Sequence, residues 1–427
     1  MTKNDIHWEI LFDKMQILNR IKTDGFFEIT AAEIKTQGKR EARLMTKFDY
    51  YSQLPALFKE NNLSVLPLTR GTYVIAPIKT FHKFEQKKIP VQRVEFPAFY
   101  ESIDFRNITS ESTALNCAFL TGILEHFLED EKLMQTVSGR MRSSDFTFQI
   151  NSLNDRPPLP VSVNNAQIEI DGGYEGMNYL SLIEAKNSIS EDFLIRQIFY
   201  PFKLWSNKIR KPVKNIFLTY TNGIFHLREY VFADSENYNS LILTKESKYA
   251  IRNESITIAL IQEIQKTTKI VKEPALPFPQ ADSFARVINL CELLAEKETL
   301  TKEEITLNYD FDIRQTDYYT NAGRYLGLTE KGKSEQIAYS LTDFGKAVMS
   351  LPVFERQKEF IKLILSHKVF NEALSVYFTK YTTPAKSKIV EIMKRSNLYN
   401  INSEVTFRRR ASTITGWINW ILESAEE

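Results

Sequence analysis

Apolar residues recur at helical spacing along some stretches of the chain and alternate or run together along others. In HWEILFDKMQILNRIKTDG, residues 7–25, the apolar positions lie three or four residues apart and stop at glycine, which predicts a helix. Alternating or continuously apolar stretches predict strands. They occupy residues 64–78, 145–152, 160–171, 178–187 and 214–232.

The order of these elements predicts four domains, which are 1–85, 86–271, 280–351 and 352–427. The first has helices followed by a hairpin that turns at Arg70–Gly71, which is typical of a winged helix and equally of other small helical subdomains. In the second, strands flank a predicted crossover helix over 190–207, an order typical of an α/β sheet. The three prolines of 272–282 predict a linker. Helices and a hairpin follow it, again a winged-helix order, and the mostly helical last domain suggests a second such unit.

Composition places the chain among globular proteins. Of its 427 residues, 43% are hydrophobic and 25% charged, and the net charge is only +2, so basic residues must cluster locally to attract nucleic acid. They do so in QGKREARLMTK, SGRMRSSD, WSNKIRKPVK and TFRRRAS. Two distant cysteines exclude a disulfide framework and a cysteine-rich zinc site. Neither a membrane-spanning apolar run nor a leader is evident, so we expect a cytoplasmic protein.

Residues 169–189, IEIDGGYEGMNYLSLIEAKNS, place charged groups where two buried strands are predicted. Side chains alternate along a strand, so Glu184 and Lys186 share one face while Ala185 points away. We expect Asp171 to end the preceding strand, because the glycines of GGYEGMN suit a tight turn. This arrangement brings the carboxylates of Asp171 and Glu184 within reach of one ion. The alternative is a salt-bridged hairpin at a sheet edge, although charge in a buried strand is costly without a function.

Such a pair of carboxylates suits a divalent cation, which removes their mutual repulsion. Hard oxygen ligands favour Mg²⁺. Phosphodiester hydrolysis needs a polarised phosphate, an activated water and stabilisation of the leaving oxygen. Lys186, beside the ion, can hold or deprotonate the water and neutralise the pentacovalent anion.

The residues Asp171, Glu184 and Lys186, in the order helix, strand, strand, helix, resemble the PD-(D/E)xK nuclease superfamily over residues 109–235. One departure is Ile170, where many members have proline. The resemblance implies Mg²⁺ on Asp171 and Glu184 and a catalytic Lys186. It also implies that Glu111 is a further metal ligand and that Gln197 positions DNA or water. The alternative for Glu111 is an acidic side chain that stabilises the N-terminus of its helix. The alternative for Gln197 is a polar surface residue.

A second motif, GLTEKGKS at residues 327–334, fits the phosphate-binding pattern G-x-x-x-x-G-K-[ST]. A phosphate-binding loop must follow a strand and open a helix. Here a predicted helix precedes the motif and a predicted strand follows it, so we interpret it as the tip of a wing. No nucleotide cofactor is expected.

Basic and amide side chains suggest where DNA binds. The stretch DIRQTDYYTNAGRYLGL looks like a recognition helix, because arginine reads guanine and asparagine or glutamine reads adenine in the major groove. For any single residue, a solvated helix face is the plain alternative. The predicted contacts are Arg140, Arg142, Arg314, Gln315, Tyr318, Asn321, Arg324, Lys331, Lys333, Arg408, Arg409 and Arg410.

We therefore expect a mixed α/β protein: a PD-(D/E)xK core with a central mixed β-sheet flanked by helices, between N- and C-terminal winged-helix domains. The expected activity is Mg²⁺-dependent, sequence-specific cleavage of double-stranded DNA, as by a type II restriction endonuclease. We expect a homodimer on DNA, a cognate DNA methyltransferase as functional partner, and no membrane partner. The alternatives are a methylation-dependent or repair endonuclease and a non-catalytic winged-helix regulator.

Overall fold

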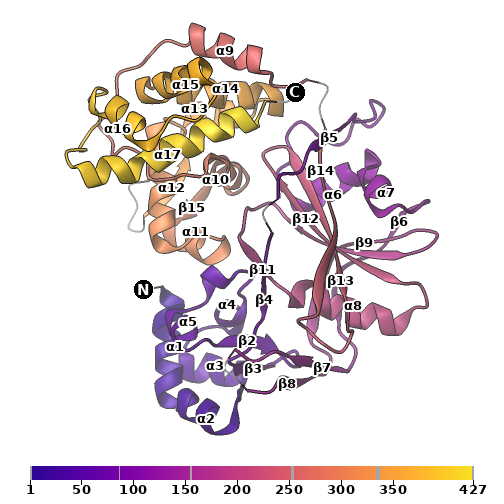
Figure 1. Cartoon of the computed structure of the whole chain (residues 1–427). Coiled ribbons are helices and arrows are strands. Elements are labelled where there is room, and N and C mark those ends of the chain that lie inside the picture. Colours follow the sequence, from indigo (N-terminus) through magenta and orange to yellow (C-terminus); the bar gives the residue numbers. More distant parts are fainter. Residues whose placement is uncertain (1, 86, 154–155, 252–253, 333–336, 426–427) are drawn as a thin grey trace.

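The computed structural model describes residues 2–85, 87–153, 156–251, 254–332 and 337–425, and its chain forms three parts (Figure 1). An N-terminal unit lies beside a large sheet, and the C-terminal helices lie against both. The mixed α/β class is confirmed. Within the described residues, no helix has both the length and the apolarity needed to cross a bilayer.

The N-terminal unit combines helices with a three-stranded sheet. Its elements are α1 (Lys3–Lys14), α2 (Ile17–Asp24), β1 (Phe27–Thr30), α3 (Ala31–Gly38), α4 (Ala42–Thr46), the 3-10 turn η1 (Tyr51–Gln53), α5 (Ala56–Glu60), β2 (Ser64–Pro67) and β3 (Thr72–Ala76). The predicted hairpin is confirmed as β2–β3, and β1 adds a third strand on the other side of β3. Thr30 ends β1 and begins α3, because its side chain accepts from the amide of Glu33 while Glu33 bonds back to it.

The central sheet has seven strands. In spatial order they are β5 (Val91–Val94), β14 (Leu241–Ile251), β13 (Ile224–Phe232), β12 (Val213–Thr221), β10 (Leu180–Lys186), β9 (Gln167–Glu175) and β6 (Met134–Arg142). β10 pairs in parallel with β12, and the predicted crossover helix, α8 (Arg196–Lys208), is confirmed between them. Helices α6 (Glu111–Leu120) and α7 (Ile123–Leu128) pack against one face of the sheet, and α8 covers the other.

Two small antiparallel pairs join the sheet to the N-terminal unit. β4 (Phe81–Lys83) pairs with β11 (Asp192–Leu194), and β7 (Phe146–Ile150) pairs with β8 (Leu159–Val163). Buried residues of β2 and β3 share one apolar core with β7, β8 and α8. The N-terminal unit is therefore packed onto the sheet domain.

The C-terminal part begins with α9 (Ile258–Thr267) and repeats the topology of the N-terminal unit before it becomes all helical. Its further elements are α10 (Phe284–Lys297), β15 (Thr299–Thr301), α11 (Lys302–Asn308), α12 (Ile313–Tyr325), β16 (Thr329–Lys331), β17 (Ala338–Leu341), α13 (Asp343–Met349), α14 (Val353–Leu365), α15 (Lys368–Lys380), α16 (Lys386–Lys394) and α17 (Glu404–Glu423). The strand order β15–β17–β16 matches β1–β3–β2. Thr301 caps α11 with Glu304 as Thr30 caps α3 with Glu33.

The proline-rich segment 272–282 is not the free linker that the sequence suggested. Phe278 and Ala281 are buried in the C-terminal core, which also takes in Ile261 of α9. The Trp417 indole donates to the carbonyl of Ala281 at 2.6 Å, and Thr413 donates to that of Pro279 at 3.2 Å. The segment is thus part of the C-terminal unit, because its apolar side chains gain more from this core than from solvent.

The expected winged-helix-like domain at 352–427 also differs from the structure. Its described residues form α14, α15, α16 and α17 and no named strand, so the segment has no wing. Its buried side chains belong to the same apolar cluster as those of α10 and α12. The predicted boundary at 351 therefore divides one continuous core.

We expect Trp417→Ala to loosen the segment 272–282. The substitution removes a fully buried ring, stacked on Phe370 at 4.9 Å between centroids, and the hydrogen bond to Ala281. Loss of a buried tryptophan costs roughly 3–5 kcal/mol. Limited proteolysis should cleave near Phe278 faster in the variant than in the wild type. Equal resistance would mean that the segment does not depend on this core.

Candidate active site

The candidate site lies where β9 and β10 separate. The antiparallel ladder between them ends at the pair Ile183–Gly172. Beyond it, the backbone amide of Ala185 donates to Asp171 Oδ2 at 2.8 Å, so a side chain replaces the backbone acceptor. Asp171 does not end its strand as predicted, because β9 continues to Glu175. The separation leaves the end of β10 open for side chains from other elements.

A buried aspartate fixes the turn of this hairpin. Asp130 accepts hydrogen bonds from the backbone amides of Glu131, Asn178 and Tyr179. Burial alone would raise the pKa of Asp130, but these amides outweigh it and lower the pKa. Gly176 is required beside it, since a Cβ there would lie 2.3 Å from Asp130 Oδ2. Asp130, in the loop before β6, thus holds the turn that joins β9 and β10.

Glu184, Lys186 and Gln197 form one hydrogen-bonded cluster. Lys186 Nζ lies 2.5 Å from Glu184 Oε1, and Gln197 Nε2 donates to the same oxygen at 2.6 Å. Glu184 is only 8% exposed, and the Lys186 side chain is 14% exposed. Both project from β10 toward α8, which carries Gln197 as its second residue. The shared face predicted for Glu184 and Lys186 is confirmed.

The charges of neighbouring acidic groups change the pKa values of Glu184 and Lys186. Burial raises the pKa of Glu184 to about 8; the Lys186 ammonium opposes this shift and the Asp171 carboxylate adds to it. Burial disfavours the charge of Lys186, but the carboxylates of Glu184, Glu111, Asp171 and Asp49 outweigh it and raise its pKa. Of these carboxylates only Glu184 bonds directly to Lys186, and the others act on its charge from a distance. A divalent cation would favour the ionised form of Glu184.

Glu111 reaches the cluster from the first turn of α6. Ser110 caps this helix by accepting from the amide of Thr113 at 3.1 Å. Burial raises the pKa of the Glu111 carboxyl; Lys186 and the amide of Asn187 lower it, and Asp171 raises it. Glu111 therefore lies near enough to Lys186 and Asp171 for their charges to act on it, and its role as a further ligand stays a prediction.

The oxygen ligands of the site can be compared with those that Mg²⁺ prefers. In the described part of the chain, no three His, Cys, Asp or Glu side chains form a group ready to hold a metal ion. Asp171 and Glu184 supply two carboxylates, and Mg²⁺ commonly uses one or two together with waters and substrate phosphates. Gln197 Oε1 is buried and has no hydrogen-bond partner among the described residues, so one further acceptor is available. The residues present fit such an ion.

The C-terminal unit bonds directly to the chain that follows Lys186. Asn289 of α10 donates to the carbonyl of Asn187 at 2.8 Å and accepts from the amide of Ile189 at 2.9 Å. Asn187 Nδ2 donates to Glu296 Oε2 at 2.8 Å, and Asp310 accepts from the amide of Glu191. On the other side, Tyr50 of the N-terminal unit bonds to Ser188 at 2.8 Å.

The predicted DNA contacts on α12 differ in availability. Arg314 is exposed and Tyr318 is partly exposed. Gln315 instead bonds back to the amide of Asp312 at the start of its own helix, and Arg324 donates to Asn321 Oδ1 at 3.0 Å. The side chains best placed to meet a ligand are therefore those of Arg314 and Tyr318.

The three predicted arginines of α17, Arg408, Arg409 and Arg410, lie in its second turn, and Arg410 lies near Tyr318 of α12. Arg408 pairs with Glu404 at 3.4 Å, whereas exposed Arg409 has no hydrogen bond or ion pair among the described residues. Burial lowers the pKa of Arg410, as does Arg409, and nearby Tyr318 raises it. Arg409 is thus the most available of the three.

The remaining predicted contacts lie on the edge strand β6 and on the β16–β17 hairpin. Arg140 is bonded to Glu169 across β6 and β9 at 3.1 Å, and Arg142 is exposed at the same sheet edge. Lys331 is exposed on β16, and Lys333 lies outside the described residues. Thr329–Lys331 is a strand paired with β17, as expected for a wing and not for a phosphate-binding loop.

Sequence reasoning missed Asp49, Asp130, Asn289 and Glu296. A signal existed for the last two, because α10 carries Arg286, Asn289, Glu292 and Glu296 along an otherwise apolar helix. Polar residues at this spacing on a buried helix predict a polar partner. The loops that carry Asp49 and Asp130 show no comparable pattern.

Three segments of the chain match families described only as domains of unknown function. These are residues 5–75 (DUF6996), 76–250 (DUF6997) and 286–426 (DUF7226). They coincide closely with the N-terminal unit, the sheet domain and the C-terminal unit. No curated protein and no solved structure matches the chain.

We expect Glu184→Gln to stabilise the metal-free protein increasingly as pH rises. The folded state keeps the Glu184 proton up to about pH 8, whereas the unfolded chain releases it near 4.5. The wild type therefore loses stability through this window, by up to about 1.4 kcal/mol per pH unit, and the variant does not. Thermal unfolding in EDTA from pH 5 to 8 measures the difference. Glu169→Gln, at an exposed position of β9, is the control, and a pH-independent difference for Glu184→Gln would contradict the shift.

We expect Asn289→Leu to free the chain after Lys186. Asn289 is 1% exposed, and its loss leaves the Asn187 carbonyl and the Ile189 amide without partners. Hydrogen exchange at Ile189 should become faster. Asn371→Leu is the matched control, because Asn371 bonds to carbonyls of 265 and 365 within the C-terminal unit. If both variants exchange alike at Ile189, α10 does not hold this loop.

Proposed function

We propose that the chain is a Mg²⁺-dependent endonuclease that cleaves both strands of duplex DNA at a specific sequence, as type II restriction enzymes do. The observation that carries the proposal is the convergence of Asp171, Glu184, Lys186 and Gln197 at the end of β10. The succession α6, β6, β9, β10, α8, β12, with β10 parallel to β12, supports the PD-(D/E)xK resemblance.

In this proposal Asp171 and Glu184 hold the ion, with Glu111 as a further ligand. When bound, Mg²⁺ supplies polarisation of the scissile phosphate and activation of a water. Lys186 holds its ammonium in the same cluster, where it can orient the water and offset the charge that grows on the phosphorus oxygens. Gln197 keeps Glu184 oriented through Nε2 and leaves Oε1 free to accept from water.

The flanking units supply DNA binding in this proposal. Both contain a three-stranded sheet with the same strand order, beside helices, which supports the winged-helix proposal. The C-terminal unit presents Arg314 and Tyr318 on α12, and Tyr318 lies near Arg410 of α17, which follows exposed Arg409. Such side chains suit bases and phosphates. Cleavage of two strands needs two sites, so we propose a homodimer on DNA and a cognate methyltransferase that protects the host sequence.

A second candidate is a DNA-binding regulator with a silent core. The observation behind this candidate is the direct ion pair of Lys186 with Glu184, because a structural ion pair accounts for that contact without catalysis. A methylation-dependent or repair endonuclease would use the same site on another substrate. Digestion of methylated and unmethylated plasmid with Mg²⁺ distinguishes all three.

We expect Lys186→Ala to retain specific DNA binding and Mg²⁺ binding while it loses cleavage. A positioned proton-transfer group contributes roughly 100- to 10,000-fold, and loss of the charge adds to this. Asp171→Ala and Glu184→Ala should lose both cleavage and Mg²⁺ binding. The measurements are plasmid cleavage and metal titration on the same preparations, with Glu169→Ala as the carboxylate control. Cleavage by Lys186→Ala at the wild-type rate would refute the site.

A further inference from the structure

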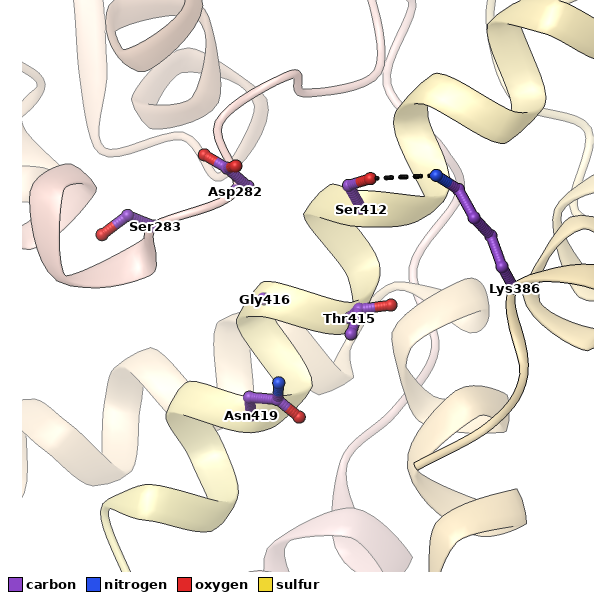
Figure 2. A pocket seen from close by; sticks show the side chains of 7 residues that line it. All are labelled: Asp282, Ser283, Lys386, Ser412, Thr415, Gly416 and Asn419. Atoms are coloured by element: carbon purple, nitrogen blue, oxygen red, sulfur yellow. Dashed lines mark hydrogen bonds between the residues drawn. The ribbon is translucent and has the colours of Figure 1, made fainter. Parts of the chain in front are cut away.

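An open groove of about 540 Å³ lies between α17, the start of α16 and the segment before α10 (Figure 2). Its lining is formed mainly by polar side chains, which are Asp282, Ser283, Lys386, Ser412, Thr415 and Asn419. Ser412, Thr415 and Asn419 recur along the side of α17 opposite its buried stripe. None of these residues belongs to the cluster at the end of β10.

The groove is rigidly built. Gly416 packs so closely on the chain at Asp282 that a Cβ would lie 1.9 Å from the Asp282 carbonyl oxygen. The hydrogen bonds of Trp417 to Ala281 and of Thr413 to Pro279 hold the same segment against α17. The walls are therefore in place without a ligand.

Unpaired positive charge lies at one end of the groove. Lys386 bonds only to Ser412 Oγ, at 3.3 Å, and has no ion pair among the described residues. Arg409 lies one helical turn before Ser412 on the same side of α17. Asp282 stands on the opposite wall (Figure 2). Its Oδ1 accepts from the Tyr319 hydroxyl at 3.4 Å.

We propose that this groove binds a backbone phosphate of duplex DNA at its Lys386–Ser412 end. Hydroxyl, amide and lysine donors are those that typically hold DNA phosphates. Tyr319, which bonds to Asp282, belongs to α12, so the groove adjoins the helix whose outer face carries Arg314 and Tyr318. The inference rests on the proposed function in taking DNA as the ligand, but it needs no cleavage. Free inorganic phosphate offers the same oxygens.

The test compares Lys386→Gln with Lys388→Gln in the full chain. Lys388 lies on the same helix and is paired with Glu391, so it serves as the matched control. Affinity for two unrelated duplexes is measured in EDTA at several salt concentrations. The loss of one phosphate contact should lower the slope of log K against log salt by about 0.9 for both duplexes. Lys388→Gln should keep the wild-type slope, and Ser412→Ala should weaken binding less than Lys386→Gln does.

The other outcomes separate failure of the groove from failure of the proposed endonuclease. An unchanged slope for Lys386→Gln rejects the groove, and so does a wild type that binds no duplex. If inorganic phosphate raises the unfolding temperature of the wild type but not of Lys386→Gln, while DNA affinity is unchanged, the groove takes free anions instead. A wild type that binds DNA in EDTA but does not cleave it with Mg²⁺ rejects the endonuclease and leaves the groove result standing.

Discussion

The hydrogen bond from the Ala185 amide to the Asp171 carboxylate is the contact on which the arrangement of the site depends. It satisfies a buried backbone donor at the point where β9 can no longer do so. The strands can then separate. The last residues of β10 stay paired with β12 but have no partner residue on β9, and Gln197 of α8 bonds to Glu184 there. A backbone acceptor at this position would have continued the ladder and left no room for Gln197 or Glu111.

Around this opening, all three parts of the chain contact one short loop. Tyr50 comes from the N-terminal unit, Asn289 and Asp310 from the C-terminal unit, and each bonds within residues 187–191. The buried Asn289 side chain bonds to both a backbone carbonyl and a backbone amide of this loop, as the backbone of a neighbouring strand would. The position of Lys186 is thus coupled to α10, and α10 packs against α12. In the proposed enzyme, this is a direct mechanical connection between the helix that reads DNA and the strand that carries the lysine.

The two units of similar topology differ where binding is concerned. Between its capped helix and its hairpin, the C-terminal unit has the single 13-residue helix α12, with a partly exposed polar face. The N-terminal unit has the short α4, η1 and α5, and Phe58 of α5 is buried against Trp8. These short elements provide no long helix that could enter a groove in DNA, and α5 is held in the core by this aromatic pair. The N-terminal unit instead places Tyr50 and Asp49 beside the site.

Local patterns in the sequence determined the strands β10 and β12, the crossover helix, the shared face of Glu184 and Lys186, and the strand that takes the place of a nucleotide loop. These depend on side-chain period and turn residues, which act over a few positions. Only the tertiary structure decided that β9 runs past Asp171, that Phe278, Pro279 and Ala281 are buried, and that Asn289 and Asp49 adjoin the site. Each of these depends on partners tens to hundreds of residues away: Asp130 against the hairpin turn, Trp417 against Ala281, and α10 against the loop after Lys186. The local pattern does not identify these partners. The polar positions of α10 indicate a polar partner but not which one, because the free energy of such contacts comes from which distant surfaces fit together.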